Sequence, residues 1–170
     1  MNENSFVAVL MGSDSDLPTV QGTIDVLDQF HIPCEVKITS AHRTPSATIA
    51  YVQNAETRGC AIFICAAGLA AHLAGLVAAH TLRPVIGIPM DSGPLTGIDS
   101  LLSTVQMPGG VPVACMAIGR AGARNAAYFA IQILSLSDPD LAARLRADRE
   151  NAANIVLAKD ANLRRARTPL

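Results

Sequence analysis

The sequence predicts a doubly wound α/β fold, in which a parallel sheet of five strands lies between two layers of helices. Apolar runs too short for helices alternate along the chain with longer segments of helical periodicity. This alternation is typical of parallel strands joined by right-handed crossovers. Five such units favour the strand order 2-1-3-4-5, which is a flavodoxin-like three-layer α/β/α sandwich with an extra C-terminal helix.

The first two strands flank the first helix. Phe6–Met11 is a continuous apolar run that ends at Gly12, so it predicts a strand buried on both faces. Asp16 is the expected helix cap, and Pro18 is tolerated in the first turn. The expected core face of this helix consists of Val20, Ile24, Val26, Leu27 and Phe30. A second strand is predicted over 33–39.

The middle of the chain predicts two more helices around a third strand. Thr44 and Pro45 are the expected cap and first residue of a helix that ends near Gly59. A strand is predicted over 61–66, and small residues predict a helix over about 70–81.

The last third predicts two strands and three helices. The fourth strand, over 85–88, is bounded by prolines, and a short helix follows over 98–105. The fifth strand is predicted over 111–117, a long helix over 120–136, and a final helix over about 138–159. Because no linker divides the chain, we expect one domain over 1–170. The final helix follows the fifth unit, so it is expected to pack on a neighbouring subunit or on its own domain.

Composition excludes several classes of partner. The 170 residues carry a net charge of -1, so no overall field attracts nucleic acid or a membrane surface. No apolar run is long enough to span a bilayer, and the N-terminus lacks signal-peptide features, which predicts a cytoplasmic protein. The four cysteines show no metal-binding spacing. Only 16% of the residues are charged, which suggests surface buried against further copies of the chain.

The loop after the first strand is a candidate ligand cradle. Ligands of open parallel sheets bind beyond the carboxyl ends of the strands. Gly12 allows a close turn, Ser13 and Ser15 supply hydroxyl groups, and the following helix N-terminus favours an anion. The loop is neither a P-loop nor a GxGxxG motif, so it does not predict a dinucleotide. A plain helix-capping role is the alternative.

Two histidines follow the second and third strands. His42 is of a residue type suited to proton transfer, and the guanidinium of Arg43 suits a phosphate group. Ser40 adds a hydroxyl group to the same loop. His72 lies in an apolar stretch, where a helix-start histidine held by the backbone is the alternative to a site residue.

The chain resembles the family of N5-carboxyaminoimidazole ribonucleotide mutases, the PurE proteins. The matching motifs are MGSDSD (11–16), SAHRTP (40–45), AAHLAG (70–75), GIDSLLSTVQMPGGVPV (97–113) and AIGRAGARNAA (117–127). They occur in the family's order and cover the chain from about Val7 to Leu157.

The resemblance implies a homo-octamer with active sites at subunit contacts, and an isomerase of purine biosynthesis. That enzyme converts N5-carboxyaminoimidazole ribonucleotide to 4-carboxy-5-aminoimidazole ribonucleotide without metal or cofactor. His42 would be the general acid and base. The substrate-binding residues would be Ser13, Ser15, Asp16, Ser40, Ala41, Arg43, Gly68, Leu69, Ala70 and His72. The stretch from Met90 to Leu95 would help to enclose the imidazole and the CO2.

Three residues depart from the family pattern. Leu69 stands where a glycine is usual, Ala74 replaces a proline, and Asp91 adds a negative charge near the expected substrate. Two alternatives to the mutase are a carboxylase that takes CO2 directly and a non-catalytic nucleotide-binding flavodoxin-like module; the departures at Leu69 and Asp91 bear on the second. Arg43 and the AAHL segment favour the mutase over the carboxylase.

Overall fold

A computed structural model describes residues 5–167. It forms two compact units, the first ending at Ile131 and the second beginning at Gln132. The elements are β1 (Phe6–Met11), the 3₁₀ turn η1 (Asp14–Asp16), α1 (Leu17–Gln29), β2 (Cys34–Ile38), α2 (Pro45–Thr57), β3 (Cys60–Ala67), α3 (Leu73–Ala78), β4 (Val85–Pro89), α4 (Ile98–Val105), β5 (Ala114–Cys115), α5 (Gly119–Ser135) and α6 (Pro139–Arg167).

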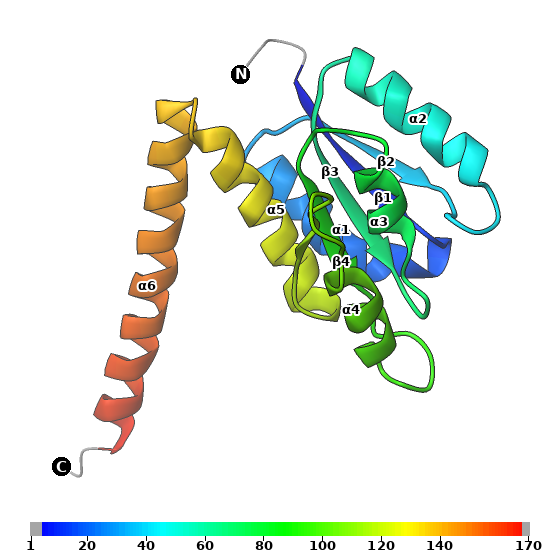
Figure 1. Cartoon of the computed structure of the whole chain (residues 1–170). Coiled ribbons are helices and arrows are strands. Elements are labelled where there is room, and N and C mark those ends of the chain that lie inside the picture. Colours follow the sequence, from blue (N-terminus) through cyan, green and yellow to red (C-terminus); the bar gives the residue numbers. More distant parts are fainter. Residues whose placement is uncertain (1–4, 168–170) are drawn as a thin grey trace. The chain divides into compact units, whose positions relative to one another are not determined.

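The five strands form one parallel sheet in the predicted order, β2-β1-β3-β4-β5 (Figure 1). All six residues of β1 are buried, as expected for a continuous apolar run at the centre of a sheet. The predicted fold class is confirmed.

Helices cover both faces of this sheet. A buried cluster joins β1 and β3 to α2 and α3, with Phe63, Val52 and Leu73 among its members. On the opposite face α1 lies beside α5. The Thr23 hydroxyl of α1 donates to the Ala123 carbonyl of α5 at 2.8 Å. Because all strands are parallel, their carboxyl ends lie at the same edge of the sheet.

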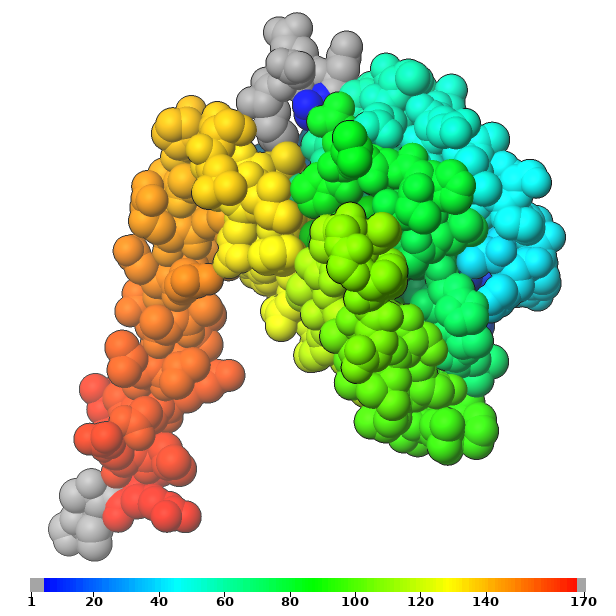
Figure 2. Space-filling view, viewed as in Figure 1, coloured from blue at the N-terminus to red at the C-terminus, as the bar shows by residue number. Residues whose placement is uncertain are grey.

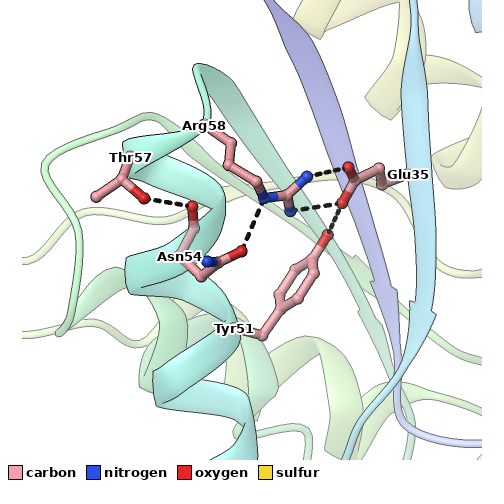
Figure 3. A network of polar contacts seen from close by, with 5 residues as sticks. All are labelled: Glu35, Tyr51, Asn54, Thr57 and Arg58. Carbon is pink, nitrogen blue, oxygen red and sulfur yellow. Dashed lines mark hydrogen bonds and ion pairs between the residues drawn. The ribbon is translucent and has the colours of Figure 1, made fainter.

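Edge strand β2 is fastened to α2 by a polar network at the surface (Figure 3). Arg58 donates to both carboxylate oxygens of Glu35, and the Tyr51 hydroxyl donates to one of them at 3.0 Å. Asn54 accepts from Arg58 Nε at 2.7 Å. The hydrogen bonds from Arg58 are the main cause of the lowered pKa of Glu35. The network fixes the strand that leads to the loop with His42.

The fifth strand is shorter than predicted. Only Ala114 and Cys115 pair with β4, whereas the apolar run predicted a strand over 111–117. Pro112 has no N–H to donate to a ladder, and Val111 closes a turn onto the Pro108 carbonyl at 3.3 Å. The strand prediction was therefore wrong at both ends.

The third helix is also shorter than the predicted span of 70–81. It begins at Leu73, because Leu69 has a φ of 54°, which is incompatible with a right-handed helix, and the chain then turns before the helix begins. It ends at Ala78. The residues before it are left in a loop at the edge of the sheet.

The second unit contains the long helix α6. It begins with a cap in which the Asp138 carboxylate accepts from the Leu141 N–H at 2.9 Å. It runs to Arg167, beyond the predicted end near 159, and Arg164 pairs with Asp160 one turn earlier at 2.9 Å. No helix within residues 5–167 is long and apolar enough to cross a membrane.

Candidate active site

A cavity of about 630 Å³ lies at the carboxyl edge of the sheet, where the loops after β1, β2, β3 and β4 meet. This is the position at which open parallel sheets bind their ligands. The lining residues are Gly12, Ser13, Ser15, Asp16, Ser40, Ala41, His42, Arg43, Ala67, Gly68, Leu69, Ala70, His72, Leu73 and Ser92. All eleven site residues predicted from the sequence are in this set, so the structure brings them to one place.

The loop after β1 combines a helix cap with groups that face the cavity. Ser13 Oγ accepts from the Ser15 N–H at 3.3 Å, and Asp16 Oδ2 accepts from the Ser13 N–H at 3.2 Å. These two bonds form a capping box at the start of η1. The Asp16 side chain makes no capping bond to α1, the helix that follows. The capping alternative is therefore correct, and it leaves Ser15 and Asp16 on the cavity wall.

Asp16 is a buried carboxylate with 7% of its surface exposed. Burial raises its pKa, and the nearby charge of Asp14 acts in the same direction. The hydrogen bond from Ser13 opposes this shift without cancelling it. An acidic side chain held in this way is a strong acceptor for hydroxyl groups of a ligand.

The loop after β2 is held by a chain of hydroxyl groups beneath it. Thr39 and Thr48 are buried, and their hydroxyl oxygens lie 2.6 Å apart. Thr48 also donates to the Thr44 carbonyl at 3.0 Å, and Thr44 Oγ1 accepts from the Ser40 N–H at 3.0 Å. The backbone that carries His42 is therefore tied to the end of β2 and to the first turn of α2.

His42 and His72 are in direct contact. His42 Nε2 lies 2.7 Å from His72 Nδ1, and the rings meet edge to face with their centroids 4.9 Å apart. One of the two nitrogens must donate and the other must accept, so the pair shares one proton between the facing atoms. Sequence reasoning selected both residues but missed this contact, because their strands are separated by β1 in the sheet.

Arg43 supplies positive charge at the cavity. It is the only lysine or arginine among the described residues that line it, and Arg43 Nη2 reaches the Gly12 carbonyl at 3.5 Å. The N-terminus of α2 begins two residues later, at Pro45, and adds the positive end of a helix dipole. A guanidinium beside a helix start suits a phosphate group.

The loop after β4 contributes less than expected. Of the stretch from Met90 to Leu95, only Ser92 lines the cavity, and Met90 is buried in the core. Asp91 is not among the described residues that line the cavity. Its carboxylate lies beside Gly119, the first residue of α5, where a Cβ would be 3.3 Å from the nearer oxygen. A helix N-terminus stabilises a carboxylate at that position.

No group of three or more histidine, cysteine or acidic side chains within residues 5–167 could hold a metal ion. The groups that line the cavity are a histidine pair, a buried carboxylate with serine hydroxyl groups beside it, and the guanidinium of Arg43.

Comparisons with known proteins match this chain over nearly its whole length. A family model described as AIR carboxylase matches residues 6–154. N5-carboxyaminoimidazole ribonucleotide mutase of Mycobacterium tuberculosis is 50% identical over 163 residues, which cover 96% of this chain and 92% of that protein. The mutase of Bacillus subtilis is 52% identical over 151 residues, covering 89% of this chain and 93% of that protein.

The fold is also similar to that of a solved structure. The crystal structure of Treponema denticola PurE superposes with a TM-score of 0.84 at 28% identity, covering 94% of this chain and 98% of that one. The family model spans all four loops that line the cavity, from Gly12 to Ser92. The chain therefore belongs to the AIR carboxylase family.

Proposed function

We propose that this protein is an N5-carboxyaminoimidazole ribonucleotide mutase of purine biosynthesis, with His42 as its general acid and base. About half of the residues are identical to those of curated mutases over nearly the full length of both chains. The observation that carries the role of His42 is its contact with His72 on the wall of the cavity, 2.7 Å between ring nitrogens.

The reaction needs a proton at two points. First the bond between N5 and the carboxyl carbon breaks, its electrons stay on nitrogen, and the nitrogen takes a proton as CO2 leaves. Then C4 of the electron-rich ring attacks CO2, and the C4 proton leaves to restore the aromatic ring. A single imidazole that gives the first proton and takes the second leaves the enzyme unchanged after each turnover.

The histidine pair suits this exchange. Because the facing nitrogens share one proton, the contact couples the protonation of the two rings and supports the position of the His42 ring. The hydroxyl chain beneath the loop supports the same placement. His42 therefore acts on the reacting atoms, and His72 acts by orienting it.

The other lining groups divide by chemistry. Ser13, Ser15 and Asp16 face the ribose hydroxyl groups, and Arg43 with Ser40 holds the phosphate. Ala41, Gly68, Leu69, Ala70 and His72 surround the imidazole and the CO2. This division follows from the carboxylate, cation and apolar character of the three parts of the cavity wall.

A turnover assay tests the proposal. The purified protein receives N5-carboxyaminoimidazole ribonucleotide in one tube, and aminoimidazole ribonucleotide with bicarbonate in another. We expect the 4-carboxy product to form rapidly from the first substrate alone. We expect His42→Asn to lose about a hundred- to ten-thousand-fold in rate, the usual cost of removing a positioned acid or base.

The outcomes separate the alternatives. Rapid product only from aminoimidazole ribonucleotide and bicarbonate would identify a direct carboxylase. No product from either substrate would favour a nucleotide-binding module. His42→Asn protein with a normal circular dichroism spectrum and normal turnover would remove His42 from the mechanism.

We also propose that copies of this chain assemble, as the family resemblance implies with its homo-octamer. Helix α4 supports this, because Ile98, Leu102 and Val105 are 51%, 54% and 47% exposed on one side of it. Figure 2 shows the segment around α4 in yellow-green at the surface of the first unit. Apolar side chains arranged in this way are typical of a contact surface.

A further inference from the structure

Ser92 is a serine of the cavity wall whose side chain makes no hydrogen bond within residues 5–167. Four serines line the cavity, and the other three are bonded to their own loops. The Ser15 hydroxyl donates to Ser13 Oγ at 2.8 Å, and Ser40 Oγ accepts from the Arg43 N–H at 3.1 Å. The Ser92 hydroxyl is therefore free to donate to a ligand.

The backbone before Ser92 is fixed at the end of β4. The Met90 N–H donates to the Ala67 carbonyl at 2.9 Å, which ties it to the end of β3. The Met90 carbonyl accepts from the buried Ser100 hydroxyl of α4 at 2.7 Å. Ser92 thus lies two residues after a point that is held from two sides.

A glycine on the neighbouring loop makes room for the Ser92 side chain. A Cβ on Gly68, in the loop after β3, would collide with Ser92 Oγ. Gly68 is not among the glycines with positive φ, so the backbone conformation does not require a glycine there. The missing side chain instead lets the hydroxyl group lie directly against the backbone of Gly68, itself a lining residue.

The side of the cavity that carries Ser92 has few polar groups. From Ala67 onward, two polar side chains line the cavity, those of His72 and Ser92. His72 is already in contact with His42 at 2.7 Å. The other lining residues of this side have aliphatic side chains or none: Ala67, Gly68, Leu69, Ala70 and Leu73. An anionic group of a ligand on this side has Ser92 as its hydroxyl donor.

We propose that the Ser92 hydroxyl donates a hydrogen bond to the carboxylate of the bound nucleotide and makes the site prefer carboxylated nucleotides over aminoimidazole ribonucleotide. The inference rests on the proposed mutase function, whose substrate and product each carry a carboxylate in addition to the phosphate. Arg43 holds the phosphate in that proposal, so the carboxylate needs a second donor. A hydrogen bond to an ionised acceptor is about twice as strong as one between neutral groups. Ser92 therefore sets specificity and exchanges no proton.

Two nucleotides that differ in the carboxylate alone isolate this bond. The first is 4-carboxy-5-aminoimidazole ribonucleotide, and the second is aminoimidazole ribonucleotide, which lacks the carboxylate. Isothermal titration calorimetry measures the Kd of each. For Ser92→Ala we expect the Kd of the carboxylated nucleotide to rise about tenfold to a hundredfold, the usual effect of a hydrogen bond to a charged group. The Kd of aminoimidazole ribonucleotide should stay at the wild-type value.

Ser15→Ala is the matched control in the same cavity. It removes one hydroxyl group from the loop after β1, on the side assigned to the ribose. Because both nucleotides contain the ribose, we expect this variant to leave the ratio of the two Kd values unchanged. Ser92→Ala should change that ratio. Alanine keeps the Cβ of serine and removes only the hydroxyl group, so the melting temperature of Ser92→Ala should match that of wild type.

Two results for Ser92→Ala would contradict the inference. If the variant binds the carboxylated nucleotide as tightly as wild type, the hydroxyl group does not contact the carboxylate. If both Kd values rise by the same factor, Ser92 acts on a part that the two nucleotides share, or on the loop itself.

Failure of the proposed function would be seen in the wild-type protein. That protein would then bind neither nucleotide, or would form no 4-carboxy product from N5-carboxyaminoimidazole ribonucleotide. In the first case the role of Ser92 falls with the function. In the second case, a ratio of Kd values that depends on Ser92 would still establish carboxylate recognition by a nucleotide-binding protein.

Discussion

At the scale of single residues, Asp16 is a carboxylate whose burial disfavours its charged form. Its carboxylate is buried, and its pKa is raised chiefly by that burial. A raised pKa in the folded state means that folding favours the protonated form. The stability contributed by this group is therefore present at low pH and is lost as the pH rises through the raised pKa.

Asp16→Asn should reverse this effect at neutral pH. Asparagine keeps an oxygen that can accept from the Ser13 N–H but carries no charge to desolvate. We expect the melting temperature of the variant to exceed that of wild type at pH 7. The difference should shrink towards zero below about pH 4, near the ordinary pKa of aspartate.

The same substitution should weaken substrate binding. A hydrogen bond to a charged group contributes about 1.5–3 kcal/mol, so the KM should rise about tenfold to a hundredfold. Thermal scans from about pH 3 to pH 8, with steady-state kinetics at pH 7, measure both effects. An unchanged melting temperature at pH 7 would contradict the burial argument, and an unchanged KM would remove Asp16 from substrate recognition.

The histidine pair shows what sequence reasoning can and cannot reach for a residue. His42 and His72 each follow a predicted strand, so both could be placed at the same edge of the sheet. The strands before these two loops, β2 and β3, are separated by β1 in the sheet. The 2.7 Å contact between the histidines therefore depends on the conformation of both loops. Loop geometry of this kind is set by packing between segments distant in sequence, which no local pattern encodes. The role of each residue remains a prediction.

At the scale of elements, the loop with His42 depends on the helix beneath it. Thr48 is fully buried on α2 and bonds both Thr39, at the end of β2, and the Thr44 carbonyl. We regard Thr48 as a positioning residue, because it does not line the cavity. Valine has nearly the same shape, so Thr48→Val removes these bonds with little change in volume.

Thr48→Val and Thr23→Val form a matched pair. Thr23 is equally buried, on α1, and donates one hydrogen bond to the Ala123 carbonyl away from the cavity. Each variant removes hydrogen bonds made by a buried hydroxyl group, and one such bond contributes about 0.5–1.5 kcal/mol of stability. Only Thr48→Val should also lower kcat/KM, on the order of tenfold, since small misplacements of catalytic groups reduce rates strongly.

Urea unfolding and steady-state kinetics on both variants test this. Equal loss of stability with a fall in kcat/KM for Thr48→Val alone supports the positioning role. An equal fall in both would mean that general stability limits activity. Unchanged kinetics for Thr48→Val would show that the loop holds His42 without the hydroxyl chain.

Element boundaries were predictable where local chemistry sets them. The helix over 98–105 begins and ends as predicted, and β1 spans the whole apolar run. Two boundaries were wrong for identifiable reasons. Pro112 prevents a ladder that hydrophobicity alone would extend, and the positive φ of Leu69 excludes helix from a segment of good helix formers. The first signal was visible in the sequence, whereas the second comes from tertiary contact.

At the scale of the whole molecule, helix α4 has its polar side inward. Ser100 and Thr104 are buried against the sheet, and Thr104 packs on Gly87 so closely that a Cβ there would collide with it. Their hydroxyl groups bond backbone carbonyls at 2.7 Å, which makes burial inexpensive. Ile98, Leu102 and Val105 consequently face outward, although burial of each side chain is worth about 1.5–3 kcal/mol.

The outward position of these apolar side chains is explained if α4 packs against another copy of the chain. Leu102→Glu places a charge at the centre of that surface, and a charge without a partner is strongly unfavourable in an apolar contact. We expect the variant to sediment as a smaller species than wild type while keeping its circular dichroism spectrum. If active sites lie at subunit contacts, as the family resemblance implies, turnover should fall together with assembly size.

Leu82→Glu is the control, because Leu82 is fully exposed in the loop between α3 and β4 and belongs to no apolar cluster of α4. It should change neither the sedimentation coefficient nor turnover. Analytical ultracentrifugation over a range of concentrations compares the three proteins. A Leu102→Glu protein of wild-type size would place the contact elsewhere and would leave the outward apolar side of α4 without this explanation. A smaller species with full turnover would instead show that one chain completes the active site by itself.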